Sequence, residues 1–356
     1  MSTIILTIST DIFYTRIALS RDENVFYQRD IDHSKDDFIQ MDNIMDQLPF
    51  RRDAIMNQMR NDAIDLKSIL YVVAEGGLLK PCETGIYEID KTMVGDLIDG
   101  VGGDDVINMA GLLAFTIASI LRVRSLVVDP ASVDERSELA SFSAHPITRK
   151  KSLFHALIHK YLSNKYARSL NKNYDEMNLI FCHVSDRNVS VAAHKKGRVV
   201  DVNQAYMGFG PMGFFETGTM PVSNVLDMMF KKHYPKDEML KLINRNATFN
   251  YYASTNSCDE IMRMPQNDNR TNLILEVMAY QIAKEIASHY VTLDGKIDAV
   301  ILSGKIFSDK RFFKYLYKRI ENLAAIQSYP KDYTIDALIF NVLKMVNGKS
   351  KIKTYG

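Results

Sequence analysis

The sequence predicts an α/β protein made of two similar domains. Segments of strand character alternate along the chain with segments of helical period. Two stretches half a chain apart share one plan of apolar strand, polar turn, alternating strand, charged turn and third strand; they are residues 4–30 and 178–203. At 356 residues the chain is also longer than one ordinary core requires. We therefore expect two duplicated domains that each open with a three-stranded meander and face each other across an interdomain cleft.

Each element is expected from its pattern of apolar residues. Strands are expected at 3–9, 15–20, 24–30, 68–77, 125–130, within 178–203, and at 298–304. Helices are expected at 36–48, 51–64, 104–121, 150–170, 269–291 and 336–347. The last helix is followed by Gly348, and glycine is the residue that most readily adopts the left-handed turn that ends helices.

The composition excludes several classes of protein. The chain has 46% hydrophobic and 24% charged residues, and its net charge of +1 gives no reason to expect nucleic acid or an anionic membrane as a partner. Cys82, Cys182 and Cys258 are far apart and odd in number, which favours the reduced thiols of a cytoplasmic protein. No metal-binding spacing and no long apolar window is present, so we expect neither a metal site built by the protein alone nor a membrane span. The first eleven residues predict a strand and not a signal peptide.

A polar turn in the second meander raises the question of function. It consists of Ser185, Asp186, Arg187 and Asn188, between a buried strand and the strand that returns from it. Backbone N–H groups of hairpin turns at a domain cleft can grip the phosphates of ATP. This turn has no glycine, so the residues alone leave open whether it binds a nucleotide or has lost that ability.

Several motifs resemble those of one known family along nearly the whole chain. They are EGGLLKP (75–81), VVDPASVDE (127–135), SLFHAL (152–157), AHKKGRVVDVN (193–203), MAYQIAKEI (278–286) and KIDAVILSG (296–304). Their order and spacing are similar to those of the butyrate kinases, which belong to the acetate kinase family within the actin-like ATPase superfamily. The resemblance implies two actin-like (ribonuclease H-like) domains, Mg-ATP, and a short-chain fatty acid such as butyrate or isobutyrate. The implied reaction is ATP + carboxylate ⇌ ADP + acyl phosphate.

Two phosphate loops of the family are rewritten in this chain. The first reads Asn-Pro-Gly-Ser-Thr-Ser-Thr-Lys in the family, and its positions here are Ser9, Thr10, Asp11, Ile12, Phe13, Tyr14, Thr15 and Arg16. Bulky side chains prevent the close approach of backbone amides to phosphate that small residues permit. The second loop, His-x-Gly-Gly-Gly in the family, is His183 followed by Val184 and the glycine-free turn 185–188.

Two arginines of the family are replaced by carboxylates. The family motif GRGGLLKP is AEGGLLKP here, so that Glu75 stands at the position of an arginine that meets the transferring phosphoryl group. The family motif GEGPFSPERSGGLP is GFGPMGFFETGTMP, and Glu216 stands at the second arginine. An arginine supplied to a phosphoryl transition state is worth roughly 10³ to 10⁵ in rate. A carboxylate ~4 Å from a phosphate repels it by about 1 to 4 kcal/mol, depending on the effective dielectric constant.

Other positions match the family, and each also has a plainer explanation. Asp129 matches a strand-end aspartate that would orient Mg²⁺ or the attacking carboxylate, but it could also simply form a turn before Pro130. His183 and His155 match family histidines, but His183 could also be a core or turn histidine, and His155 could simply bridge the domains. The resemblance implies a carboxylate pocket at Gly76, Gly77, Asn108 and Pro211, although Asn108 could be a helix-surface amide.

The nucleotide side is partly retained. Ser303 and Gly304 follow a buried strand and precede a helix, where N–H groups can meet a nucleotide. Lys305 replaces the family's second glycine and could either pair with a phosphate or block its approach. Together with these, the resemblance places the phosphates near Arg16, His183 and the turn 185–188. Mg²⁺ brought by ATP would lie near Ser9, Asp11 and Asp129.

Two hypotheses of function remain open from the sequence. One is an active carboxylate kinase with a rebuilt phosphate site, in which Arg16, Arg187 and Lys305 supply positive charge. The other is a catalytically impaired or inactive relative that acts as a binding or scaffold protein. No motif or charge patch supports a metal-dependent hydrolase or a nucleic-acid binder.

The resemblance also implies an organisation of the chain. We expect one domain at residues 1–165, a second at 166–331, and the helix within 332–348 packed back on the first domain. A homodimer is expected on family grounds.

Overall fold

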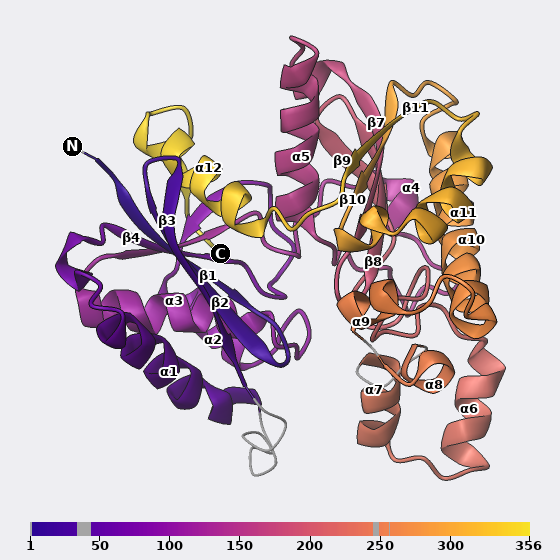
Figure 1. Cartoon of the computed structure of the whole chain (residues 1–356), viewed down its shortest axis with the longest axis horizontal. Coiled ribbons are helices and arrows are strands. Elements are labelled where there is room, and N and C mark those ends of the chain that lie inside the picture. The colour runs from indigo at the N-terminus through magenta and orange to yellow at the C-terminus, as the bar shows by residue number, and fades with distance from the viewer. Residues whose placement is uncertain (1, 34–43, 245–248, 256) are drawn as a thin grey trace. The chain divides into compact units, whose positions relative to one another are not determined.

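The computed structural model describes residues 2–33, 44–244, 249–255 and 257–356 (Figure 1). Contacts divide the chain into two compact units. Unit 1 comprises Met1–Asp134, Ala156–Lys160 and Tyr333–Gly356, and unit 2 comprises Glu135–His155 and Tyr161–Asp332. The domain boundary expected near residue 165 stays a prediction, and limited proteolysis would test it.

Unit 1 contains a seven-stranded sheet in the order β12-β5-β6-β4-β1-β2-β3. Its strands are β1 (Ile4–Thr10), β2 (Tyr14–Arg21), β3 (Asn24–Asp32), β4 (Tyr71–Glu75), β5 (Ile86–Glu88), β6 (Arg124–Val128) and β12 (Ile352–Lys353). The first three form the predicted antiparallel meander, while β4 runs parallel to β1 and β6 parallel to β4. The carboxyl ends of β1, β4 and β6 therefore share one edge of the sheet, which is where open α/β sheets bind ligands.

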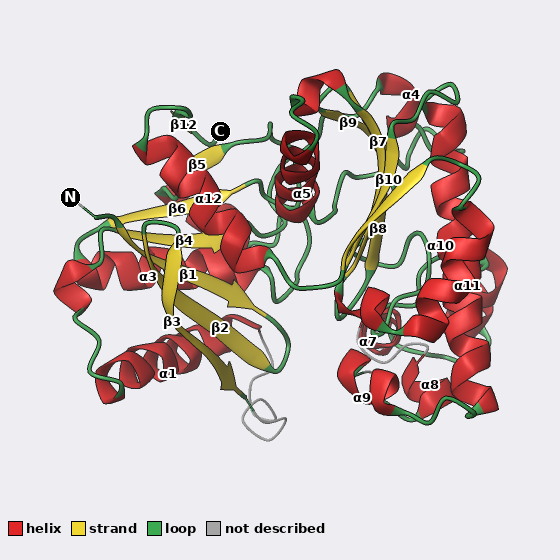
Figure 2. Cartoon of the chain, turned by 45° about the horizontal axis from the view of Figure 1, so that its top comes forward, coloured by secondary structure: helices red, strands yellow, loops and turns green. Residues whose placement is uncertain are grey.

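Helices cover both faces of this sheet (Figure 2). They are α1 (Gln47–Asn61), α2 (Lys91–Ile98), α3 (Asn108–Leu121) and α12 (Thr334–Val346). Leu6 of β1 packs in one core with Ile55 of α1 and Leu113 of α3. Helix α12 contacts β1 and β4 and lies on the opposite face from α1 and α3. Because both faces are covered, β1 is a nearly continuous apolar run instead of an alternating one.

Unit 2 contains a five-stranded sheet in the order β11-β10-β7-β8-β9. Its strands are β7 (Asn178–Val184), β8 (Val189–Lys195), β9 (Arg198–Val202), β10 (Ala299–Ser303) and β11 (Ala325–Tyr329). Again the first three form an antiparallel meander, and β10 runs parallel to both β7 and β11. Lys196 and Gly197 have φ values of +50° and +80°, as a tight two-residue hairpin turn requires. The second meander therefore repeats the plan of the first, as predicted.

The helices of unit 2 pack on this sheet and extend beyond it. They are α4 (Glu138–Ser141), α5 (Ala156–Ser169, of which Tyr161–Ser169 lies in unit 2), α6 (Val222–Phe230), α7 (Lys236–Asn244), α8 (Phe249–Ala253), α9 (Cys258–Arg263), α10 (Asn269–Thr292) and α11 (Lys310–Ile320). Ile282 of α10 and Leu316 of α11 share a core with Val191 of β8 and Val300 of β10.

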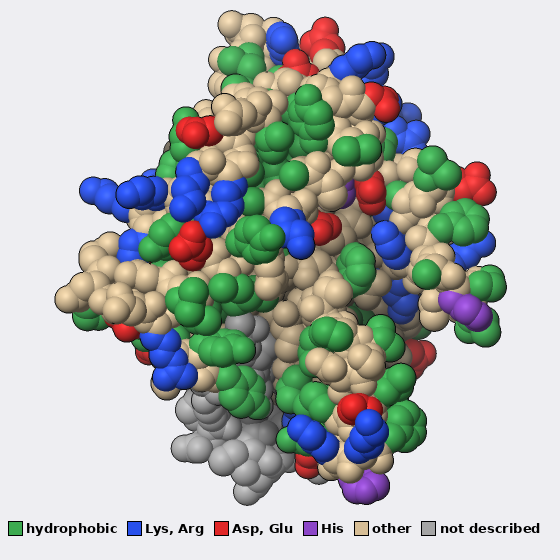
Figure 3. Space-filling model, turned by 90° about the vertical axis from the view of Figure 1, so that its right-hand side faces the viewer, with side chains coloured by type: hydrophobic (Ala, Val, Ile, Leu, Met, Phe, Trp, Pro, Cys, Tyr) green, Lys and Arg blue, Asp and Glu red, His purple; other side chains and the backbone are tan. Residues whose placement is uncertain are grey.

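Helix α6 has an exposed apolar face. None of its residues is buried, and Val222, Leu226 and Phe230, which are spaced four residues apart, are all exposed. Figure 3 shows hydrophobic side chains on the surface at the lower right of that view, next to charged ones. Helices α6 to α9 are short, and no long period of 3.6 in the sequence predicts them.

The α/β class is confirmed, with differences at several boundaries. The helices expected at 104–121 and 150–170 begin later than expected, at Asn108 and Ala156. The helix expected at 51–64 is part of α1, which begins earlier, at Gln47 after a short 3₁₀ turn at Ile44–Asp46, and ends earlier, at Asn61. Residues 36–43 of another expected helix lie outside the described residues. Within the described part of the chain, no helix is both long and apolar enough to cross a membrane.

Candidate functional site

The predicted site residues of unit 1 gather at the carboxyl edge of its sheet. Ser9 lies near the end of β1, Glu75 is the last residue of β4, and Asp129 directly follows β6. Glu75 is in register with Val128, so Glu75 and Asp129 leave the sheet at neighbouring positions. Parallel pairing of β1, β4 and β6 brings these three residues together although they are far apart in the sequence.

The turn between β1 and β2 uses its own side chains to satisfy its backbone. Asp11 accepts a hydrogen bond from the backbone N–H of Ile12 at 2.6 Å, and the N–H of Asp11 itself donates to the carbonyl of Tyr14. Two amides of the turn are therefore committed within the turn, which leaves fewer donors for a phosphate than a glycine-rich loop offers.

A buried arginine that was not predicted from the sequence donates hydrogen bonds to this turn. Arg51 of α1 is fully buried and donates to the carbonyls of Ile12 (2.9 Å) and Tyr14 (3.1 Å) and to the hydroxyl of Thr15 (2.9 Å). Burial lowers its pKa to about 10, which leaves the guanidinium charged at neutral pH. The only signal in the sequence was an arginine on the apolar face of an amphipathic helix, which also fits a surface residue.

Two further side chains of this edge are paired. Arg16, expected to bind phosphate, makes two hydrogen bonds of 2.6 Å to Asp30 on β3. Ser9, expected near Mg²⁺, donates to the carboxylate of Glu75 at 2.5 Å. The carboxylate at the family's arginine position thus holds the serine of the rewritten loop, which joins the ends of β1 and β4.

The Gly76-Gly77 turn depends on close approach. A Cβ added to Gly76 would lie 2.7 Å from Pro130, and one added to Gly77 would lie 2.4 Å from Oδ1 of Asn108. That same oxygen of Asn108 accepts from the N–H of Leu78 at 2.7 Å, and its Nδ2 donates to the carbonyl of Gly103. Asn108 is buried and not the helix-surface amide of the plainer explanation. Gly76, Gly77 and Asn108 are brought together, whereas Pro211 belongs to unit 2.

Asp129 is held in an unusual conformation. It is buried, and its φ of +40° lies in the left-handed region that non-glycine residues rarely adopt. Its carboxylate accepts from the hydroxyl of Thr84 (2.6 Å) and the N–H of Gly85 (2.7 Å). Such strain persists where surrounding contacts enforce it, and it is found disproportionately at functional sites.

In unit 2 the turn between β7 and β8 is also satisfied from within. The hydroxyl of Ser185 accepts from the N–H groups of Arg187 (3.1 Å) and Asn188 (2.9 Å), and the Ser185 N–H donates to the carbonyl of Asn188. The Ser185 oxygen therefore accepts the backbone N–H groups that, in a glycine-rich phosphate loop, would donate to a phosphate oxygen. In both hairpin turns a side chain of the turn accepts backbone N–H groups, and residues 11–14 and 185–188 have no positive φ that would favour glycine.

The carboxylate at the second family arginine position is buried beside this turn. Oε1 of Glu216 accepts from Nδ2 of Asn188 at 2.7 Å and lies 3.4 Å from Nη2 of Arg187. Oε2 accepts from the N–H of Met207 at 3.1 Å. A guanidinium is thus present beside position 216, but it comes from the turn and is paired with the carboxylate.

Two histidines lie together at the base of the turn. The rings of His155 and His183 are 4.6 Å apart in an edge-to-face arrangement. His155 Nδ1 bonds the hydroxyl of Ser190 at 2.8 Å, and His183 Nδ1 bonds that of Ser303 at 3.2 Å. Burial lowers the pKa of His183 to about 4, and burial together with the charge of Arg187 lowers the pKa of His155. Both imidazoles are therefore neutral at pH 7.

The junction after β10 brings the remaining predicted residues to the same edge. Ser303 ends β10 beside His183, with which it is in register, and Gly304 and Lys305 follow. Gly304 has a φ of +128°, and a Cβ there would lie 2.0 Å from the carbonyl oxygen of Val184, so no side chain fits. Nζ of Lys305 lies 3.0 Å from Oδ2 of Asp186.

The unit 1 edge carries the carboxylates of Glu75 and Asp129, and the unit 2 edge carries the ammonium group of Lys305. Within the described residues, no group of three His, Cys, Asp or Glu side chains could hold a metal ion. Mg²⁺ is commonly held through phosphates with only one or two carboxylates, so the absence of a protein cage in the described residues is compatible with a metal that arrives on ATP. At the same edge as Lys305 lie the neutral ring of His183 and the side chain of Asn188, whose Nδ2 donates to Glu216.

Comparison with known proteins gives the family. The model of the acetokinase family matches residues 141–320. Butyrate kinase 2 of Clostridium acetobutylicum is 33% identical over 352 residues, which is 99% of each chain.

Solved structures agree on the fold. The acetate kinase of Porphyromonas gingivalis superposes with a TM-score of 0.76 at 14% identity, covering 97% of this chain and 100% of its own. A propionate kinase of Francisella tularensis superposes with a TM-score of 0.75 at 14% identity, covering 95% of this chain and 98% of its own. The predicted duplicated actin-like fold is thereby confirmed. On these grounds, and by its full-length likeness to a butyrate kinase, the chain belongs to the acetokinase family.

Proposed function

We propose that this protein is a carboxylate kinase that transfers the γ-phosphoryl group of ATP to a short-chain fatty acid such as butyrate or isobutyrate. A carboxylate oxygen of the acid forms a bond to the γ-phosphorus, and the bond from that phosphorus to the bridging oxygen of ADP breaks. The observation that carries the proposal is the 33% identity to Butyrate kinase 2 over 99% of both chains.

The geometry of unit 1 supports a role for Asp129. The residue lies at the carboxyl end of β6, is held by Thr84 and Gly85, and adopts a left-handed conformation. In the proposed reaction its carboxylate orients the Mg²⁺ that accompanies ATP or the attacking acid. The neighbouring Gly76-Gly77 turn and Asn108 form the wall against which a small carboxylate would pack.

The geometry of unit 2 supports nucleotide binding. His183, Ser303 and Lys305 meet at the carboxyl edge of its sheet, and phosphate binding there is supported by the charge of Lys305. Transition-state charge must be neutralised without arginine at positions 75 and 216. Arg187, which is buried and paired with Glu216, is the guanidinium that we propose for that role.

A second candidate function is a non-catalytic relative that binds ligands or a partner without phosphoryl transfer. The carboxylates of Glu75 and Glu216 favour it, because a negative charge at these positions repels the transferring group. The paired state of Arg16 points the same way, since its guanidinium is committed to Asp30.

The test is formation of acyl phosphate trapped with hydroxylamine, with Mg-ATP and a panel of acids of two to five carbons. Turnover with one acid above the level of boiled protein supports the kinase and identifies the substrate. No turnover with any acid, in folded protein that runs beside an active butyrate kinase, supports the second candidate.

Location and assembly are also proposed on family grounds. We expect a cytoplasmic protein that forms a homodimer. Light scattering coupled to size-exclusion chromatography would give the mass of the assembly, and a monomer at micromolar concentration would contradict the dimer.

A further inference from the structure

A half-buried ion pair joins the two segments of unit 2 between which the proposed nucleotide site lies. Nζ of Lys305, at the start of the short 3₁₀ turn Lys305–Ser308, is 3.0 Å from Oδ2 of Asp186 in the β7–β8 turn. The two side chains are 31% and 32% exposed, so both can be reached by a ligand. The pair spans the carboxyl ends of β7 and β10, which run parallel side by side.

The position of Lys305 is fixed by the backbone around it. Gly304 packs directly on the carbonyl of Val184 at the end of β7, and its N–H donates to the carbonyl of Tyr329 at 3.2 Å. Ser303, one residue earlier, bonds the ring of His183. The Lys305 side chain therefore starts from a rigid base, while Asp186 sits at the tip of a turn.

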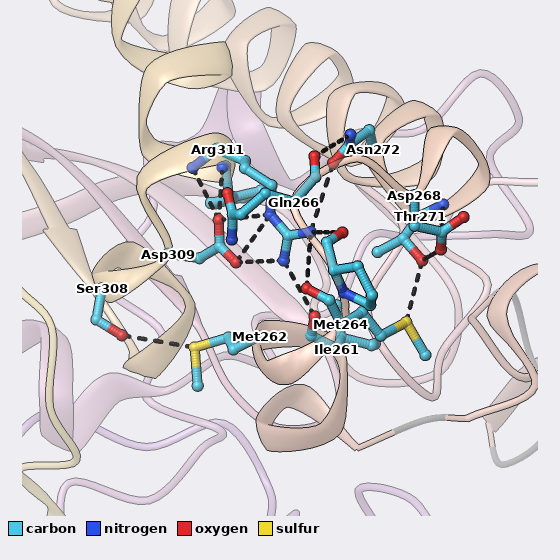
Figure 4. A network of polar contacts seen from close by, with 12 residues as sticks. Ile261, Met262, Met264, Gln266, Asp268, Thr271, Asn272, Ser308, Asp309 and Arg311 are labelled. Carbon is cyan, nitrogen blue, oxygen red and sulfur yellow. Dashed lines mark hydrogen bonds and ion pairs between the residues drawn. The ribbon is translucent and has the colours of Figure 1, made fainter.

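A buried arginine holds a third segment beside Lys305 (Figure 4). Arg311 is paired with Asp309 at 2.7 Å and donates to the carbonyls of Ile261 in α9 (3.1 Å) and Pro265 after it (3.2 Å). Helix α9 consequently packs against the 3₁₀ turn that begins with Lys305. This arrangement fixes the carboxylate of Asp259, near the start of α9, in the electrostatic surroundings of Lys305.

The ammonium group of Lys305 is surrounded by acidic side chains. Burial lowers its pKa, but Asp186, Asp259 and Asp332 outweigh that effect and hold the pKa above its ordinary value. Lys305 is therefore charged at neutral pH. Of the three carboxylates, Asp186 is the one for which a direct contact with Nζ is observed.

We propose that Asp186 occupies, in the nucleotide-free protein, the place on Lys305 that a nucleotide phosphate takes when it binds. Binding is then an exchange of one anion for another on the same ammonium group, with Asp186 as an internal competitor. This inference rests on the proposed nucleotide site of unit 2, but not on phosphoryl transfer.

The exchange is energetically accessible. Ion pairs whose side chains both reach solvent contribute little to stability, and about a third of each side chain is exposed here, so Lys305 can leave Asp186 at low cost. A phosphate carries more negative charge than a carboxylate and makes stronger charge-assisted hydrogen bonds. Because the released Asp186 stays close to the phosphate and repels it, wild-type affinity is lower than the donors of the site alone would give.

Calorimetric titration with Mg-ADP tests the exchange directly. Asp186→Asn should lower the dissociation constant about threefold to tenfold, because the competitor loses its charge. Lys305→Met should raise it about tenfold, and Lys305→Arg should keep it within about threefold of wild type. In the Lys305→Met background, Asp186→Asn should no longer increase the affinity for Mg-ADP. The ammonium group for which Asp186 and the phosphate compete is then absent.

Asp294→Asn is the matched control. Asp294 pairs with Lys195 at 3.5 Å, in an exposed contact at the opposite end of β8, and its replacement removes the same charge. Mg-ADP affinity equal to wild type is expected for this variant. An equal gain in Asp294→Asn and Asp186→Asn would attribute the effect to net charge and overturn the proposal.

The outcomes separate this inference from the proposed function. Tighter binding in Asp186→Asn alone supports the exchange even if no acid is phosphorylated. Unchanged affinity in both Asp186→Asn and Lys305→Met, or no Mg-ADP binding by either wild type or Asp186→Asn, overturns it whether or not turnover is observed.

Discussion

Arg187 and Glu216 form a buried ion pair, with Nη2 of the guanidinium 3.4 Å from Oε1 of the carboxylate and both side chains less than one-tenth exposed. The contact places a positive and a negative charge side by side at the carboxyl edge of unit 2. Asn188 donates to the same carboxylate oxygen at 2.7 Å. The negative charge at a family arginine position is thus balanced locally, which makes the substitution compatible with a stable fold.

The pair predicts a large loss of stability when one partner is removed. Arg187→Met leaves the buried carboxylate of Glu216 without its cation, and breaking a buried pair in this way costs about 3 to 5 kcal/mol. Hydrogen exchange of the β7 and β8 amides is the measurement, because the two units can unfold in separate steps. Asp294→Asn, which breaks an exposed pair of the same unit, should cost no more than about 1 kcal/mol. Equal losses in the two variants would contradict this account.

Glu75 is expected to limit the proposed turnover. Its carboxylate, bonded to Ser9, lies at the edge where the transferring phosphoryl group would pass. Glu75→Gln keeps the shape and the bond to Ser9 while removing the charge, so kcat/KM should rise at least about fivefold. Hydroxylamine trapping measures the rate, and Glu88→Gln, which changes an exposed pair with Arg124, is the control. A fall in turnover would instead give Glu75 a direct part in the reaction.

Asp129→Asn separates chemistry from folding. Asparagine tolerates the left-handed φ of +40° and can still accept from Thr84 and Gly85, so the variant should fold normally. Loss of the negative charge should reduce acyl phosphate formation by about 10² or more, because orientation of metal or acid is lost. Circular dichroism checks the fold. Turnover within about threefold of wild type would contradict this prediction and would indicate that Asp129 only forms the turn before Pro130.

The buried histidines predict a loss of stability in acid. The pKa of His183 falls by burial from its ordinary value of 6.5 to about 4 in the folded protein, despite the opposing charge of Asp332. Between pH 6.5 and 4 the unfolded chain therefore binds a proton that the folded chain does not. The contribution of His183 to the free energy of unfolding is complete above pH 6.5. The free energy of unfolding should fall by about 3 kcal/mol as the pH drops to about 4.

A difference measurement isolates this effect from the carboxylates that titrate in the same range. Urea unfolding of wild type and His183→Asn at pH 7.5, 6.5, 5.5 and 4.5 gives the two pH profiles. The wild-type stability should fall more steeply than that of the variant in this window. Parallel profiles would show that His183 does not titrate as its burial requires.

The sequence predicted the fold better than the site, for physical reasons. Strand β1 and helix α10 carry their own apolar patterns, so their type could be predicted locally. The role of Arg51 could not, because its partners Ile12 and Tyr14 lie nearly forty residues earlier and come close only when α1 packs on the meander. Asn108 was likewise open, since its burial depends on the close approach of Gly77.

Ser185 shows a second limit of sequence reasoning. A glycine-free turn suggested that the phosphate cradle had been replaced, but not with what. The structure shows that one hydroxyl accepts two amides of the turn. Serine turns of this kind are common between strands, so the four residues alone carry no signal that distinguishes a filled cradle from an ordinary turn.

The close packing of Gly304 limits what a glycine at this position can indicate about function. Its missing side chain is demanded by the carbonyl of Val184, whatever lies in the site. A protein of this fold that no longer bound nucleotides would still require glycine at position 304. The neighbouring position 305 has no such steric requirement and could be substituted. A glycine at this junction therefore follows from the packing of β10 against the end of β7, and it does not by itself indicate nucleotide binding.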